Sequence, residues 1–202
     1  MNKEENRDNR HKARMERKKA LMDERIGQSS DEKGLLLVHT GNGKGKSSSA
    51  FGMLARALGH GMHGAVVQFI KGRDSTGEER FFSTLPQVEF HVTGDGFTWD
   101  TQNREQDILT ARKGWDLALG FLHDEKIDML ILDELNIVLK ERYLPAEEVI
   151  QALADRPPHQ HVIITGRGAP QSLIDAADTV TEMKLLKHAF SAGIKAQPGV
   201  EF

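Results

Sequence analysis

A glycine-rich segment near the start of the chain carries the residue types that bind phosphate groups. The apolar run LLLVH is followed by TGNGKGKSS, residues 40–48. Glycines at three alternating positions let the backbone turn tightly and direct its N–H groups inward, at the positive end of the helix that follows. Lys46 then supplies a mobile cation for phosphate oxygens, and Ser47 supplies a hydroxyl for a metal ion. The segment therefore predicts a site for the phosphates of a nucleotide.

This segment departs from the strict phosphate-loop pattern at one position. The pattern G-x-x-x-x-G-K-[ST] requires glycine at position 40, where the chain has Thr40. The central Gly45, Lys46 and Ser47 are kept. A glycine-rich turn of purely structural use is the alternative, and the order of strand, loop, Lys-Ser and helix argues against it.

An acidic pair ends a second apolar run. In MLILDELN, Asp133 and Glu134 stand at the carboxyl end of the predicted strand, which resembles a Walker B strand. A carboxylate there can hold hydrated Mg2+ or Mn2+, because magnesium retains several waters and needs few protein oxygens. The alternative is an acidic pair that only caps the next helix. Together with the phosphate loop, the pair predicts ATP and a divalent metal as ligands.

The pattern from Gly34 onward predicts the elements that must position these residues. Short apolar runs alternate with longer helical stretches, which is typical of βαβ units and of an α/β fold with a mainly parallel sheet of about six strands. Glycines 59, 61 and 64 are expected to end the first helix and turn the chain. Strands are predicted at 35–39, 65–70, 88–92, 129–133, 161–165 and 179–183, and helices at 46–58, 104–124, 146–154 and 170–176.

Residues 1–33 form a separate, polar N-terminal arm. Charged and amide side chains dominate it, with few apolar positions to support burial, and we expect a mobile or docking helix. Two readings remain open: a solvated tail, and an arm that orders when it binds a partner. With 202 residues, the chain is expected to hold this arm and one α/β domain at residues 34–202.

Composition excludes several classes of chemistry. The chain has no cysteine, so disulfides, thiolate metal ligands, iron-sulfur clusters and a cysteine nucleophile are ruled out. A net charge of -3 gives no general attraction to nucleic acid or to an anionic membrane. No apolar run approaches the roughly 18 residues of a membrane span, and the secretory stretch of about 7 to 15 apolar residues is missing. We therefore expect a cytoplasmic protein without a nucleic-acid or membrane partner.

Further motifs stand in order along the chain. They are VVQFIKG at 66–72 with Gly77 and Glu78 after it, GDGFTWD at 94–100, ILDELN, TGRGAP at 165–170 and the ending KHAFSAGIKAQPGVEF. Together with TGNGKGKSS, they resemble the P-loop type of cob(I)alamin adenosyltransferase, the ATP:corrinoid adenosyltransferase family. The resemblance covers residues 34–202, and a polar N-terminal arm is also typical of that family.

The resemblance implies a homodimeric, RecA-like enzyme of adenosylcobalamin biosynthesis or salvage. Its reaction would be attack by Co(I) of a reduced corrinoid on the 5' carbon of ATP, with release of inorganic triphosphate. The acceptor would be cobalamin, cobinamide or cobyrinic acid a,c-diamide, and a reduced flavoprotein is the expected electron donor. The nucleotide would lie in the loop in the reverse of the usual orientation, so that the triphosphate is the leaving group.

The resemblance also implies roles for individual residues. Ser47, where the family usually has threonine, should hold the metal with Asp133 or Glu134. Arg56 and Arg167 are candidates for phosphate or corrinoid contacts, with surface arginines as the alternative. The ATP contacts implied are Gly41, Asn42, Gly43, Lys44, Gly45, Lys46, Ser47, Ser48 and Arg56, and Lys46 is assigned a catalytic role.

Phe97 and Trp99 stand two residues apart in an otherwise polar segment. In an extended backbone their side chains would share one side. The resemblance implies that they lie beneath the corrin, displace the lower axial ligand and leave four-coordinate cobalt that is easier to reduce. Two aromatic side chains that fold back onto the core are the alternative.

Two other functions compete with adenosyl transfer. A P-loop NTPase or kinase would cleave at the γ-phosphate and release ADP. A non-catalytic corrinoid carrier would retain its ligand without turnover, and the complete leaving-group site argues against it. The motifs taken together favour the adenosyltransferase.

Overall fold

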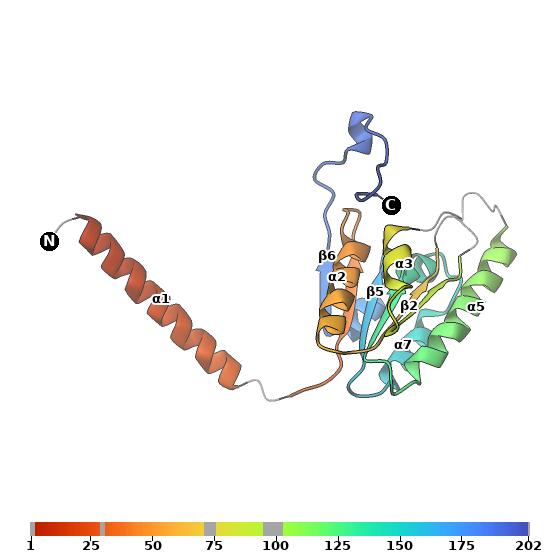
Figure 1. The fold of residues 1–202 in the computed structure, drawn as a ribbon, viewed down its shortest axis with the longest axis horizontal. Coiled ribbons are helices and arrows are strands. Elements are labelled where there is room, and N and C mark those ends of the chain that lie inside the picture. Colours follow the sequence, from red (N-terminus) through yellow and green to blue (C-terminus); the bar gives the residue numbers. More distant parts are fainter. Residues whose placement is uncertain (1–2, 29–30, 71–75, 95–102, 202) are drawn as a thin grey trace. The chain divides into compact units, whose positions relative to one another are not determined.

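The computed structural model describes residues 3–28, 31–70, 76–94 and 103–201, and it divides the chain into two compact units, 1–32 and 33–202. The first unit holds a single helix, α1 (Lys3–Gly27; Figure 1). Its lysine, arginine, glutamate, alanine and methionine residues are strong helix formers, which favours a helix even without a buried face. The apolar side chains of Met15, Leu21, Met22 and Ile26 are exposed. The helix expected in this segment is therefore present.

The second unit is built on one six-stranded sheet in the order β3-β2-β4-β5-β1-β6. Every pair of neighbouring strands runs parallel, which confirms the mainly parallel sheet predicted from the sequence. The strands are β1 (Leu36–Thr40), β2 (Gly64–Gln68), β3 (Val88–Val92), β4 (Met129–Asp133), β5 (His161–Thr165) and β6 (Thr179–Glu182). Each predicted strand is found, with ends shifted by at most two residues.

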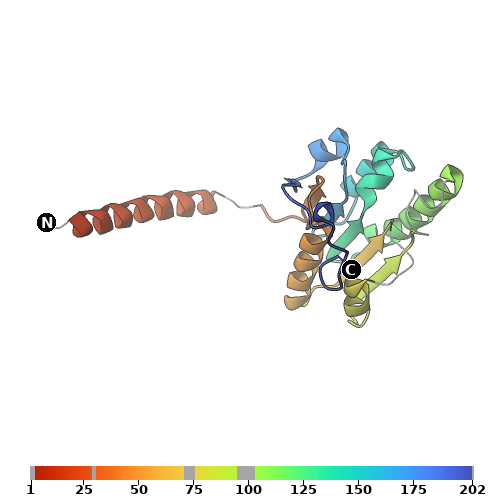
Figure 2. The same cartoon turned by 90° about the horizontal axis from the view of Figure 1, so that it is seen from above.

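Helices cover both faces of the sheet (Figures 1 and 2). Alternate residues of a strand point to opposite faces, and β1 shows this: Leu37 joins the core beneath α2 and α3, whereas Val38 joins the core beneath the other helices. The first face carries α2 (Lys46–Gly59) and α3 (Gly77–Phe82), and the second carries α5 (Arg104–Leu122), α6 (Leu135–Lys140), α7 (Ala146–Ala154) and α8 (Gln171–Ala176). A short 3-10 turn, η1 (Phe190–Ala192), follows β6.

Two short helices, α3 and α6, were not predicted. Each has six residues, which show little of a helical repeat in the sequence, although α8 of the same length was predicted at 170–176. The glycine expectation was correct at Gly61, whose φ of 78° turns the chain after α2. It was wrong at Gly64, which begins β2. A side chain there would clash, because an added Cβ would lie 2.4 Å from Leu54 Cδ1 of α2.

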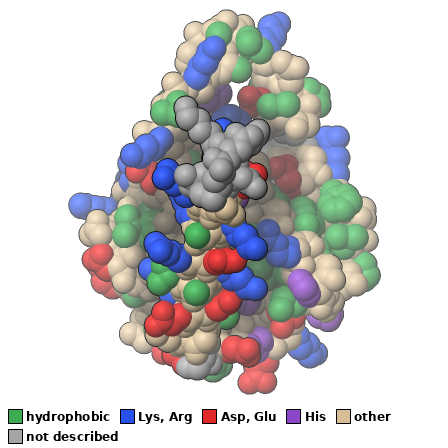
Figure 3. Space-filling model, turned by 90° about the vertical axis from the view of Figure 1, so that its left-hand side faces the viewer, with side chains coloured by type: hydrophobic (Ala, Val, Ile, Leu, Met, Phe, Trp, Pro, Cys, Tyr) green, Lys and Arg blue, Asp and Glu red, His purple; other side chains and the backbone are tan. Residues whose placement is uncertain are grey.

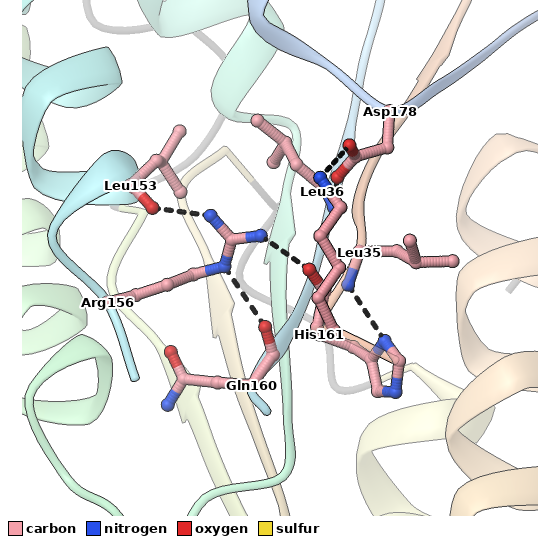
Figure 4. A network of polar contacts seen from close by, with 9 residues as sticks. Leu35, Leu36, Leu153, Arg156, Gln160, His161 and Asp178 are labelled. Atoms are coloured by element: carbon pink, nitrogen blue, oxygen red, sulfur yellow. Dashed lines mark hydrogen bonds and ion pairs between the residues drawn. The ribbon is translucent and has the colours of Figure 1, made fainter. Parts of the chain in front are cut away.

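The amino ends of β1, β5 and β6 are joined by polar contacts (Figure 4). The Arg156 guanidinium donates hydrogen bonds to the carbonyl oxygens of Gly34 and Gln160, at 2.9 and 3.0 Å. The Leu36 N–H donates to Asp178 Oδ2 at 2.9 Å, and Lys33 Nζ donates to Oδ1 of the same carboxylate. These contacts hold the start of β1, the strand that the phosphate loop follows.

Among the described residues, no helix combines the length and the apolar character that a membrane crossing requires.

Candidate nucleotide site

A cavity of about 230 Å³ opens at the carboxyl edge of the sheet. Three segments that directly follow parallel strands contribute to it: the phosphate loop after β1, Glu134 after β4 and Arg167 after β5. In open α/β sheets, ligands bind at this edge. The lining residues are Asn42, Gly43, Lys44, Gly45, Lys46, Ser47, Ser48, Thr76, Glu78, Glu134, Arg167, His188, Val200 and Glu201. Most of the predicted site residues are thus brought together.

The phosphate loop needs its glycines for two different reasons. Gly41 and Gly45 have φ angles of 96° and 105°, in the left-handed region that other residues rarely adopt. Gly43 is instead required by close approach, because an added Cβ would lie 2.7 Å from the carbonyl oxygens of Met183 and Lys184. Gly45 precedes the first turn of α2 without a side-chain cap, which leaves this helix end suited to a bound anion.

Lys46 is almost buried at the floor of the loop, with 8% of its surface exposed. Its Nζ donates a hydrogen bond to the Gly43 carbonyl at 2.6 Å. Burial lowers the pKa of Lys46, the Glu134 carboxylate partly opposes this, and Arg167 lowers the pKa further. A buried cation beside a second cation is stabilised by an arriving anion, which is the electrostatic condition for binding phosphate.

The two residues of the acidic pair occupy different environments. Asp133 is fully buried, and its two carboxylate oxygens accept hydrogen bonds from Gln68 Nε2 at 2.8 Å and from Thr165 Oγ1 at 2.7 Å. Glu134 lines the cavity and has a φ of 64°, which is uncommon for a residue with a side chain and typical of functional sites. Its N–H donates to Thr165 Oγ1 at 3.0 Å. Asp133 and Thr165 thus hold the backbone that directs Glu134 into the cavity.

The donor atoms at the cavity fit a hard divalent cation. The Ser47 hydroxyl and the Glu134 carboxylate both line it, and Mg2+ prefers a small number of protein oxygens of this kind. The Asp133 carboxylate lies beneath, bonded to Gln68 and Thr165. Of the two acidic candidates, only Glu134 lines this cavity.

The two candidate arginines lie in different places. Arg167 lines the nucleotide cavity between Gly166 and Gly168, which both have positive φ angles. Arg56 lines another cavity, of about 190 Å³, near the amino edge of the sheet. Ten residues of α2 separate it from Lys46, which corresponds to about 15 Å along the helix axis. Arg56 is therefore not brought to the phosphate loop.

Phe97 and Trp99 lie outside the described residues. Sequence reasoning assigned no ligand-binding role to Thr76, His188, Val200 or Glu201, which also line the cavity. The ending KHAFSAGIKAQPGVEF contains three of these four residues, so its place among the motifs was the available signal.

Sequence comparison decides the family. Residues 32–202 match the profile of the family ATP:corrinoid adenosyltransferase BtuR/CobO/CobP. The chain belongs to this adenosyltransferase family. Residues 1–26 match a second profile, cob(I)alamin adenosyltransferase N terminal.

Named relatives agree over nearly the whole length of this adenosyltransferase. A corrinoid adenosyltransferase of Pseudomonas aeruginosa is 60% identical over 203 residues, covering 100% of both chains. A corrinoid adenosyltransferase of Escherichia coli is 49% identical over 195 residues, which cover 96% of this chain and 99% of the relative. The corresponding enzyme of Salmonella typhimurium, named CobA, is 48% identical over the same coverage. ATP and a corrinoid are the substrates of this enzyme family.

Proposed function

We propose that the chain transfers the 5'-deoxyadenosyl group of ATP to the Co(I) of a reduced corrinoid and releases inorganic triphosphate. One observation carries this proposal: the glycine loop, Lys46, Arg167 and Glu134 converge on a single cavity at the carboxyl edge of the sheet. Cobalamin, cobinamide and cobyrinic acid a,c-diamide are the acceptors proposed, in the biosynthesis or salvage of adenosylcobalamin.

The reaction is a nucleophilic displacement at carbon. The cobalt electron pair forms the Co–C5' bond, and cobalt passes formally from Co(I) to Co(III). The C5'–O bond breaks, and its electron pair stays on the oxygen that leaves with the triphosphate. Negative charge therefore builds on the triphosphate in the transition state. Catalysis requires donors that are already directed at that group before the bond breaks.

The cavity supplies such donors from this chain. Backbone N–H groups of residues 42–48 and the positive end of α2 would bind the triphosphate, with Lys44, Lys46 and Arg167 as cations. Lys46 is the main electrostatic catalyst, because burial makes its interaction with an anion stronger than that of an exposed lysine. Ser48 would add a hydroxyl contact.

Ser47 and Glu134 would hold Mg2+ or Mn2+, with Asp133 fixing the direction of Glu134. When bound, the metal supplies positive charge that neutralises part of the triphosphate. The left-handed backbone at Glu134, hydrogen-bonded to Thr165, places this residue at the wall of the cavity. The site is thus prepared for the metal before the nucleotide arrives.

The corrinoid side of the reaction is proposed from the family resemblance. Phe97 and Trp99 would lie beneath the corrin in place of the lower axial ligand, so that a reduced flavoprotein can deliver the electron that forms Co(I). A homodimer in the cytoplasm is the proposed assembly and location. Nucleic acid and membrane are not proposed as partners.

An anaerobic assay tests the proposal. The purified chain is mixed with MgATP and chemically reduced cob(I)alamin, the corrinoid spectrum is followed, and the phosphate product is identified. We expect a light-sensitive alkylcobalamin in equal amount to inorganic triphosphate. Formation of ADP without a change at cobalt would replace the proposal with an NTPase or kinase activity.

A further inference from the structure

The C-terminal residues 183–201, which we name the strap, begin and end on the phosphate loop. At the start, the Met183 N–H donates to the Thr40 carbonyl at 2.8 Å, and the Gly43 N–H donates to the Met183 carbonyl at 2.6 Å. At the end, the Glu201 carboxylate forms an ion pair with Lys44. The strap extends beyond β6 and turns back (Figure 1). Two contacts of different kinds therefore join it to the loop.

Between these contacts, the strap is held by bonds within itself. The Ile194 N–H donates to the Ala189 carbonyl at 3.1 Å, and the Glu201 N–H donates to the Gln197 carbonyl at 2.9 Å. Hydrophobic and basic side chains stand next to each other on the upper part of the molecule (Figure 3). The exposed apolar residues of the strap are Leu185, Leu186, Phe190, Ile194 and Val200. Glu201 can therefore leave Lys44 without breaking a hydrogen bond of the sheet.

The charges that line the cavity bear on how the Lys44–Glu201 ion pair responds to a bound anion. Three of the lining residues are the cations Lys44, Lys46 and Arg167, and three are the carboxylates Glu78, Glu134 and Glu201. A polyphosphate that enters this balanced lining meets a carboxylate already bonded to Lys44. Like charges repel at short range, so the arriving anion and the Glu201 carboxylate compete for the ammonium group of Lys44.

We propose that Glu201 is a positioning residue of the nucleotide site: its carboxylate holds Lys44 at the cavity in the nucleotide-free chain and yields it to the triphosphate. The proposal rests on the proposed function, because the competing ligand is the polyphosphate of the nucleotide. Binding of the nucleotide thus releases the end of the strap.

The first test compares affinities for inorganic triphosphate with Mg2+ by titration calorimetry. The Lys44 side chain is 50% exposed and that of Glu201 is 17% exposed, and ion pairs that remain in contact with solvent contribute about 0.2–1 kcal/mol. We expect Glu201→Gln to bind triphosphate roughly 1.4- to fivefold more tightly than the wild type. Glu148→Gln is the control, because it removes the exposed Arg112–Glu148 pair between α5 and α7, and neither residue lines the cavity. Equal or weaker binding by Glu201→Gln would overturn the proposal.

A second variant separates competition for Lys44 from a general effect of charge. In a Lys44→Gln background the competing cation is gone, so Glu201→Gln should change triphosphate affinity by a smaller factor than it does in the wild type. An undiminished factor would show that Glu201 does not act through Lys44, and it would overturn the assignment.

Amide hydrogen exchange supplies a readout that a purely structural role would not move. Triphosphate should slow exchange in the phosphate loop and speed it in residues 194–201 of the wild type, and it should leave these strap residues unchanged in Glu201→Gln. Slower exchange of the strap in wild type on binding would refute release. If triphosphate binding behaves as expected but adenosyl transfer is absent, the proposed function fails and the role of Glu201 stands.

Discussion

Replacing Lys46 with methionine should remove most nucleotide binding while preserving the fold. The Lys46 side chain is buried, with 8% of the residue exposed, and its Nζ donates a hydrogen bond to the Gly43 carbonyl oxygen at 2.6 Å. Two unit charges about 4 Å apart interact by about 4 kcal/mol at an effective dielectric constant of about 20. A hydrogen bond to a charged group contributes about 1.5–3 kcal/mol net. We therefore expect Lys46→Met to lose about 3 kcal/mol of triphosphate binding, or roughly 100-fold in affinity.

Thermal unfolding with and without inorganic triphosphate and Mg2+ measures this loss. At about 100 times the wild-type dissociation constant, ligand stabilises the chain by about 2.7 kcal/mol, which raises its melting temperature by roughly 5–11 °C. At the same concentration Lys46→Met should gain only about 0.4 kcal/mol, or less than about 2 °C. Lys113→Met, on the exposed surface of α5, is the matched control.

The variant without ligand provides an internal check of the electrostatics. Burial lowers the pKa of Lys46, which means that the folded chain disfavours its charged form. Methionine has no charge to desolvate, so the unliganded variant should be at least as stable as the wild type. A variant that keeps more than half of the wild-type temperature rise with triphosphate would refute the role assigned to Lys46.

Three further outcomes are expected. Gly43→Ala should destabilise the chain by about 1–3 kcal/mol, because its Cβ would meet backbone oxygens at 2.7 Å, whereas Gly52→Ala, with open space around it, should be neutral or stabilising in urea unfolding. Phe97→Ala should lose activity when a flavoprotein must reduce the corrinoid but keep much of its rate with prereduced Co(I), and equal loss in both assays would contradict its axial role. The hydrogen bond from Lys33, followed by that from the Leu36 N–H, lowers the pKa of Asp178. Its contribution to folding stability is therefore fully present above the pKa of the unfolded chain, near 3.8, and is lost as the pH falls through the lower pKa of the folded chain. Asp178→Asn should therefore cost about 1 kcal/mol at pH 7 and almost nothing at the lowest pH that keeps the fold, and a constant difference across that range would contradict the assignment.

The sequence was sufficient for the sheet and for the phosphate loop because both depend on local patterns. Buried parallel strands appear as short apolar runs, and β4 was predicted with its observed bounds. Two of the six-residue helices, α3 and α6, were missed because so few residues give little helical periodicity, although α8 of the same length was predicted. Gly64 was misread for another reason: its glycine serves the packing of Leu54, a contact that depends on the tertiary structure.

In the candidate site too, local features could be predicted from the sequence, and features that depend on tertiary contacts could not. Residues 42–48 could be placed from the sequence, because the loop and helix that hold them are contiguous. The different environments of Asp133 and Glu134 depend on Gln68 and Thr165, which come from two other strands. Arg56 looked close to the loop along the chain, yet the length of α2 carries it to another cavity. Glu201 reaches Lys44 across 157 positions, so the motif at the end of the chain marked the segment but could not show this contact.

The place of β1 in the sheet has a consequence for how the protein is made. This strand pairs with β5 on one side and β6 on the other, and both are synthesised more than 120 residues later. While the ribosome is still producing the middle of the chain, the strand that carries the phosphate loop has no neighbour in the sheet. Such distant pairings fold slowly and leave apolar strands accessible to aggregation. The nucleotide cavity is thus a late product of folding, and a nascent chain that stops before β5 contains the phosphate-loop motif without the sheet that makes it a binding site.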